Sequence, residues 1–197
     1  MALKKLARLA VAALALVAAT AQAEVINFRF TGTVTYGGYL ALAGSRITGT
    51  FGYDTKNREP RRKDLPPGYS QEYRHYDIPA PFRLSATVGN HVIETLQLGV
   101  TVWNTRNGGN VADMVQVDGY PPIVDGTTYA NGAFGLQAAS AYDHTDVLRN
   151  TQLPRSIDVQ QFDSPGMNYG YVQTDGSQTG TLLQFTVDSI EVVPTAP

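Results

Sequence analysis

The sequence contains no cysteine. A chain without Cys forms no disulfide, offers no thiol nucleophile and holds neither a Cys-ligated zinc ion nor an iron–sulfur cluster. Exported domains often depend on disulfides, but a chain of 197 residues is long enough to rely on a hydrophobic core instead. We therefore expect packing and hydrogen bonding to hold the fold together.

Catalytic and metal-binding signatures are also missing. The chain has no Gly-x-Ser-x-Gly nucleophile elbow and no Asp-x-Asp-x-Asp-Gly calcium loop. Asp143, His144 and Asp146 are possible metal ligands, yet Asp at the start of a helical turn is equally expected for capping and for the helix dipole. We predict no catalytic residue, no metal and no cofactor.

The chain has only one sustained apolar run, Leu9–Ala19, and it is shorter than the about 20 residues that a bilayer-spanning helix needs. This run follows Lys4, Lys5 and Arg8 and precedes a small-x-small triplet that ends at Ala23. A basic region, a short apolar region and such a triplet are typical of a Sec signal peptide. We predict that residues 1–23 are a signal peptide and that the protein is exported, periplasmic or extracellular.

The chain also lacks an excess of positive charge. Its formal net charge is −2; without the three basic residues of the signal peptide, 12 Lys and Arg face 17 Asp and Glu, which gives −5. A mildly acidic protein has no electrostatic attraction to nucleic acid or to anionic lipid. We expect neither partner and no membrane span after residue 23.

What the sequence does contain is alternation of apolar and polar residues with a period of two, which predicts strands with one buried face. Four stretches carry this pattern most clearly. The residues expected to face inward are Ile26, Phe28, Phe30, Val34 and Tyr36; Ile47, Phe51 and Tyr53; Phe82, Leu84, Ala86 and Val88; and Leu96, Leu98, Val100 and Val102.

A last strand is predicted over 181–193, with Leu183, Phe185 and Val187 in the core. The alternation then changes phase, which a β-bulge near Asp188 explains. Pairing is expected to end at about Val193, because Pro194 cannot donate a ladder hydrogen bond. Residues 194–197 are expected to form a disordered tail.

Shorter strands are predicted at 111–117, 133–140 and 157–162, and one short helical turn begins at Asp143 and ends at Asn150. Many short strands with almost no helix indicate an all-β fold in one domain, 24–193. We expect a single antiparallel β-sandwich, jelly-roll-like, with a barrel as the alternative.

The basic segment 56–77 lacks this alternation and is expected to be a long exposed loop. One interpretation is a binding loop for anions or polysaccharides, with arginine donors and tyrosine stacking platforms: Arg61, Arg62, Arg74, Tyr69, Tyr73 and Tyr76. The other interpretation is a solvated hairpin insertion whose charges keep a sheet edge from pairing with other chains. Interleaved acidic residues favour the second interpretation.

Two further segments, 117–132 and 164–176, are rich in Tyr, Asn, Asp and Gly. Glycan sites on β-folds need exposed aromatic faces with amide or carboxylate partners, although loops between strands favour the same residues. The residues that we select as ligand-binding candidates are Trp103, Asp118, Tyr120, Asp125 and Tyr129.

Three stretches resemble exported bacterial proteins of the PEP-CTERM family: "FTGTVTYGG" with "ITGTFGYDT", "VLRNTQLPRSIDVQQFDS" and "LLQFTVDSIEVVPTAP". In that family the last strand runs into Val-Pro-Glu-Pro, a membrane helix and an Arg cluster. This chain has Val-Pro-Thr-Ala-Pro at that place. The resemblance implies sorting to the envelope or to an exopolysaccharide matrix, for a relative that either lacks the anchor or has lost its sorting segment.

We therefore expect a non-enzymatic exported protein that acts in the envelope or polysaccharide matrix by binding or as a structural component, with extracellular polysaccharide as its partner. The alternative is a secreted glycan hydrolase that uses two carboxylates on opposite sides of a cleft. The acidic residues considered for such a pair are Glu94, Asp113, Asp118 and Asp125.

The signal-peptide prediction is testable by N-terminal sequencing of exported protein. We expect the mature chain to begin at Glu24, because the triplet ending at Ala23 is the one good cleavage site after the apolar run. Secreted protein that still carries Met1 would contradict this assignment.

Overall fold

The computed structural model describes residues 24–57, 60–62, 71–105, 112–141, 146–175 and 180–194. Within these ranges the chain forms strands and turns and no α-helix. The strands are β1 Val25–Tyr36, β2 Arg46–Asp54, β3 Pro60–Arg62, β4 Gln71–Ile78, β5 Ser85–Val88, β6 His91–Thr105, β7 Met114–Val124, β8 Thr127–Thr128, β9 Ala133–Ala139, β10 Tyr169–Gln173 and β11 Thr181–Val193.

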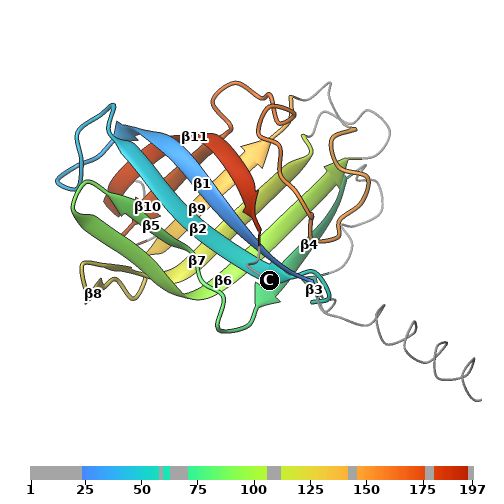
Figure 1. Ribbon diagram of the computed structural model, residues 1–197, viewed down its shortest axis with the longest axis horizontal. Coiled ribbons are helices and arrows are strands. Elements are labelled where there is room, and N and C mark those ends of the chain that lie inside the picture. Colours follow the sequence, from blue (N-terminus) through green and yellow to red (C-terminus); the bar gives the residue numbers. More distant parts are fainter. Residues whose placement is uncertain are drawn as a thin grey trace, which may run out of the picture.

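All strands belong to one antiparallel sheet, in the order β3-β4-β6-β5-β2-β1-β11-β10-β9-β7-β8. Because β6 also pairs with β7, the eight strands from β6 through β1 to β7 close into a barrel. Figure 1 shows the closure, with β1 and β11 side by side although they lie at opposite ends of the described chain. The predicted all-β class is confirmed.

The expected sandwich is not what the sheet forms. Alternating burial is the same in a sandwich and in a barrel, since each strand turns one face to a core in both. The difference lies in which strands pair across long sequence distances, here β1 with β11.

The barrel interior holds the alternating apolar residues that the pattern predicts. Phe28 stacks on Phe51 with ring centroids 4.8 Å apart, and Phe30 stacks on Phe185 at 6.0 Å. The predicted inward positions are buried with two marked exceptions: Tyr36 is 51% exposed and Leu96 is 62% exposed. Leu96 lies where β6 changes its neighbour, so the simple alternation fails there.

The predicted last strand is confirmed as β11. Its register against β1 passes from Thr31–Ser189 to Gly32–Val187, which leaves Asp188 as the extra residue of a bulge. The pairing ends with Asn27 opposite Val193, immediately before Pro194.

Strand β6 has two different neighbours on one of its edges. Its first residues pair with β5, as Glu94 opposite Ser85, and its later part, Leu98–Thr105, pairs with β4. Strand β2 follows β5 only as far as Thr50 opposite Ser85. Within the described residues, β2 beyond Thr50 therefore pairs with β1 alone, and a seam opens in the wall between β2 and β4.

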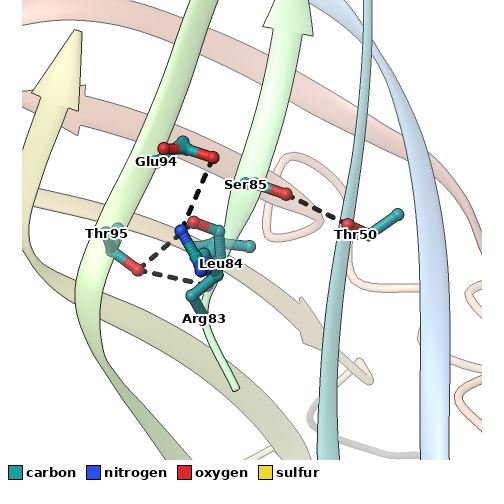
Figure 2. A network of polar contacts seen from close by, with 6 residues as sticks. All are labelled: Thr50, Arg83, Leu84, Ser85, Glu94 and Thr95. Carbon is teal, nitrogen blue, oxygen red and sulfur yellow. Dashed lines mark hydrogen bonds and ion pairs between the residues drawn. The ribbon is translucent and has the colours of Figure 1, made fainter. Parts of the chain in front are cut away.

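Polar contacts hold the chain at the point where this seam begins. Figure 2 shows the Thr50 hydroxyl 3.0 Å from the Ser85 hydroxyl, and the Thr95 hydroxyl between the backbone N–H and C=O of Leu84. Arg83 faces Glu94 at 3.8 Å. Thr95 is buried, so its two bonds to Leu84 satisfy a polar group inside the wall.

The described part of the connection between β9 and β10, residues 146–168, covers the seam and the end of the barrel at which β2 and β4 separate (Figure 1). Tyr53 and Tyr76, one from each side of the seam, donate hydrogen bonds to the carbonyls of Pro154 at 2.7 Å and Thr151 at 2.8 Å. The connection buries four apolar side chains: Leu153, Ile157, Val159 and Phe162.

Two predictions in this connection are wrong. Residues 157–162 form coil and a turn instead of a strand. The Ile157, Val159 and Phe162 side chains are buried, but the backbone of this segment pairs with no strand. Residues 146–150 form bends instead of the end of a helical turn, and Leu148 bonds through its backbone to Asp113 and Asn104. Asp143 and His144 lie outside the described residues.

The predicted exposed loop 56–77 is wrong in its second half, which forms β4. Tyr76 is 3% exposed and bonded to Thr151, so it is no surface stacking platform. Tyr73 lies against Trp103, with ring centroids 6.1 Å apart. Arg61 and Arg62 lie in β3, and Tyr69 lies outside the described residues.

The buried carboxylate of Asp113 joins three parts of the chain at the same end of the barrel. It accepts hydrogen bonds from the backbone N–H of Thr105 at 2.7 Å and of Leu148 at 2.8 Å. The Asp113 N–H in turn donates to the Ser140 hydroxyl at 3.0 Å. Burial raises the pKa of Asp113, and the backbone donors partly offset this by favouring the charged form.

Asp113→Ala should destabilise the protein by about 3 kcal/mol, because one buried and one partly buried N–H group lose their acceptor. Asp113→Asn retains one acceptor oxygen and should cost less. Urea unfolding followed by fluorescence measures both. Exposed Asp158, which bonds only within its own turn, is the matched control. Equal losses for Asp113→Ala and Asp158→Ala would show that the buried carboxylate is dispensable.

Candidate functional site

The outer face of the barrel carries a polar row that crosses four strands. The register places Asp118 of β7 opposite Gly135 of β9, Gly135 opposite Tyr171 of β10, and Tyr171 opposite Gln184 of β11. On the other side Asp118 lies opposite Gly99 of β6. Asp118 is thus flanked by a glycine on each neighbouring strand.

Gly135 leaves the space that two larger side chains need to meet. A Cβ atom at this position would lie 2.5 Å from Asp118 Oδ1 and 2.9 Å from the Tyr171 hydroxyl oxygen. Across this space the Tyr171 hydroxyl donates a hydrogen bond of 3.1 Å to Asp118 Oδ1. On the other side the His75 ring lies over Gly99, with Cε1 2.8 Å from where a Cβ would stand.

Asp118 is only 4% exposed although it belongs to the outer face. Burial raises its pKa above the ordinary 3.8, and hydrogen bonds from Gln116 and Tyr171 together with nearby His75 reduce the rise. Burial, with the Asp118 charge as a second cause, raises the pKa of Tyr120 to about 12 and also raises that of Tyr171. Both phenols are therefore neutral donors at neutral pH.

Next to this row lies a depression of about 600 Å³ on the outer face of β1, β10 and β11. Its lining combines aromatic rings, amides and hydroxyls: Thr35, Gly166, Asn168, Tyr169, Tyr171, Gln173, Gln184, Phe185 and Thr186. Tyr169 and Tyr171 lie side by side, with ring centroids 6.3 Å apart. The side-chain amides of Gln173 and Gln184 have no hydrogen-bond partner among the described residues, so they are available to a ligand.

Of the five residues selected from the sequence, Asp118 and Tyr120 belong to this region. Asp118 positions Tyr171, and Tyr120 lies two residues further along the same face of β7 and is 43% exposed. Trp103 lies apart, half-buried against Tyr73 on β4.

Asp125 and Tyr129 lie together at the opposite end of the barrel from the β9–β10 connection. Asp125 accepts a 2.6 Å hydrogen bond at Oδ2 from His91 Nδ1 and a 2.9 Å bond at Oδ1 from the Val92 N–H, and these contacts lower its pKa. The Tyr129 hydroxyl is 3.1 Å from that of Tyr39, whose ring lies edge-on to His91. These contacts join three loops.

The four acids considered for a catalytic pair do not converge on one site. Asp113 bonds to backbone N–H groups, Glu94 faces Arg83, and Asp125 holds His91. The register reveals another combination: Asp77 of β4 and Asp118 both lie opposite Gly99, one on each side. Two strand spacings separate their Cα atoms by about 10 Å.

The sequence selection missed the residues that line the depression, Tyr169, Tyr171 and Gln173. All three lie within 164–176, which had drawn attention for its Tyr, Asn, Asp and Gly content. The signal that could have identified them is the alternation of the three residues with Gly170 and Val172. This period of two predicts a strand with an aromatic outer face.

Comparison with known proteins gives no relative. No protein-family model matches the chain, and neither a curated protein nor a solved structure is significantly similar to it. The part of the chain that the structure describes contains no helix long and apolar enough to cross a bilayer. In the same residues no three His, Asp or Glu side chains are grouped so that they could hold a metal ion.

The raised pKa of Asp118 predicts a pH-dependent stability with a definite sign. Its contribution is fully present below the unfolded value of about 3.8 and is lost as the pH rises through the higher folded pKa. Asp118→Asn should remove this dependence, so the variant should gain stability relative to wild type between about pH 3 and about pH 7.

Urea unfolding across this pH range measures the effect. Tyr171→Phe removes a hydrogen bond that lowers the Asp118 pKa, so it should shift the transition to higher pH. A constant difference between wild type and Asp118→Asn at all pH values would refute a raised pKa.

Proposed function

We propose that the protein is an exported, non-enzymatic glycan-binding protein that acts in the cell envelope or the extracellular polysaccharide matrix. The depression beside Tyr169 and Tyr171 is its binding site. Glycan recognition on a β-surface needs an apolar ring face, against which the C–H groups of a sugar pack, and nearby groups that both donate and accept hydrogen bonds.

One observation carries the proposal: the lining of the depression. It offers two adjacent phenol rings, of which Tyr169 is 37% exposed. Beside them stand the free amides of Gln173 and Gln184, each able to donate and to accept. The described residues of the lining include neither a carboxylate nor an imidazole, the groups that most often transfer protons in catalysis.

The location rests on two features of the sequence. Residues 1–23 have the pattern of a Sec signal peptide. The three stretches that resemble PEP-CTERM proteins support a place in the envelope or in an exopolysaccharide matrix. A neutral, ring-lined surface on an exported barrel fits such a setting.

Replacement of Tyr169 by Ala should weaken binding to a retained polysaccharide at least tenfold, because an exposed stacking face and its contact area are lost. Affinity gel electrophoresis against a panel of soluble polysaccharides measures this as loss of retardation. Tyr73→Ala, which removes a tyrosine of the same outer wall on β4, separated from β10 by the three strands β9, β7 and β6, is the matched control. Equal losses for both variants, or no retardation of wild type by any polysaccharide, would refute the assignment.

A secreted glycan hydrolase remains the second candidate, favoured by the positions of Asp77 and Asp118. Their separation of about 10 Å between Cα atoms is compatible with the carboxyl spacing of inverting glycosidases, and the raised pKa of Asp118 suits a general acid. Asp77 is half-exposed and would serve as the base that activates water.

Release of reducing ends from the same polysaccharide panel distinguishes the two functions. A hydrolase should lose at least about a thousandfold in rate in both Asp77→Asn and Asp118→Asn. The binding function predicts no release by wild type.

A further inference from the structure

We propose that the ligand of the Tyr169–Tyr171 depression is an uncharged glycan, and that the site discriminates against polysaccharides that carry carboxylate or sulfate groups. This inference rests on the proposed glycan-binding function and adds the chemical class of the ligand. It comes from the charges around the depression.

Among the described residues, the lining contains no Lys, Arg or His side chain. Recognition of a uronate or a sulfate ester normally uses a basic side chain, most often Arg with its paired N–H donors. The hydrogen-bonding groups that line the site are amides, hydroxyls and phenols, and Gln173 and Gln184 supply both donors and acceptors. Such groups match the hydroxyls of a neutral sugar.

Acidic side chains flank the depression on both sides. On the β9 side Tyr171 donates to Asp118 at 3.1 Å. On the β1 side Thr186, which lines the site, donates to Asp188 at 2.9 Å, and Thr33 donates to the other Asp188 oxygen at 2.7 Å. An anionic glycan placed over Tyr169 would lie near the Asp188 carboxylate, and near a second negative charge at any pH above the raised pKa of Asp118.

One of these charges, Asp188, lies on the outer face by the regular alternation of β11, two residues after Thr186. Asp188 is the extra residue between Val187, which is buried, and Ser189, which bonds to Thr31 at 2.8 Å. The bulge leaves Asp188 without a partner residue on β1, and its carboxylate accepts hydrogen bonds from both Thr33 and Thr186. These two contacts hold an acid at the rim of the depression.

The matched pair of hydroxyethyl cellulose and carboxymethyl cellulose tests the charge preference on one backbone. Highly methyl-esterified pectin and polygalacturonate form a second pair on another backbone. In low salt the neutral member should bind roughly threefold to tenfold more tightly, since like charges about 10 Å apart repel measurably. The difference should shrink in about 0.5 M NaCl, where the Debye length is only a few ångströms.

Asp188→Asn is the diagnostic variant because it keeps the shape and removes one rim charge. Its affinity for the neutral member of each pair should stay within about twofold of wild type. The difference in affinity between the neutral and the anionic member should decrease. Glu191→Gln is the control, because Glu191 lies on the same outer face but is paired with Arg29. This variant should leave the difference in affinity between the neutral and the anionic member unchanged.

The outcomes separate the two proposals. Binding to the anionic member as tight as to the neutral member, or tighter, would overturn the charge assignment and leave glycan binding intact. Stronger binding to an amine-bearing glycan such as chitosan than to its N-acetylated form would overturn the assignment of an uncharged ligand, because the flanking acids would then select a cationic glycan. No binding to any polysaccharide would remove the proposed function itself.

Discussion

The division of β6 between two neighbours is the constraint on which the rest of the structure depends. One edge of β6 pairs with β7 from Ile93 to Trp103, and this pairing closes the sheet. The other edge passes from β5 to β4 near Leu96, so the wall cannot follow one uninterrupted ladder. The β9–β10 connection must then supply the missing packing, and Tyr53, Tyr76 and Asp113 hold it in place.

The same closure creates the proposed site. Strand β10 enters the sheet between β9 and β11 after the connection has crossed the barrel end, and it brings Tyr169 and Tyr171 to the outer face. Gly135 on β9 leaves room for the Tyr171 hydroxyl to reach Asp118. Their hydrogen bond orients the phenol ring on the outer face. The result is a ring-lined depression whose floor is part of the barrel wall.

The strands that could be predicted from the sequence are those in which local alternation alone decides burial. Residues 26–34, 47–53 and 181–193 are of this kind, and even the bulge at Asp188 follows from a change of phase. The choice between the sandwich and the alternative barrel could not be made from the sequence, because closure depends on the pairing of distant strands such as β1 and β11. Strand β4 was missed because its buried face combines Tyr76 and Ile78 with charged neighbours. The strand predicted at 157–162 was wrong because the apolar side chains of a coil segment can fill the end of a barrel core as well as those of a strand can.

The described part of the sheet ends at β3, of three residues, and at β8, of two residues. Long free strand edges recruit other chains, whereas very short ones offer few unpaired backbone groups. Closure of the wall through β6 and β7 removes the two outer edges that the same eight strands would expose as an open sheet. Fewer exposed edges mean fewer backbone groups that a second copy of the chain could pair with, so the closed wall opposes aggregation at high local concentration.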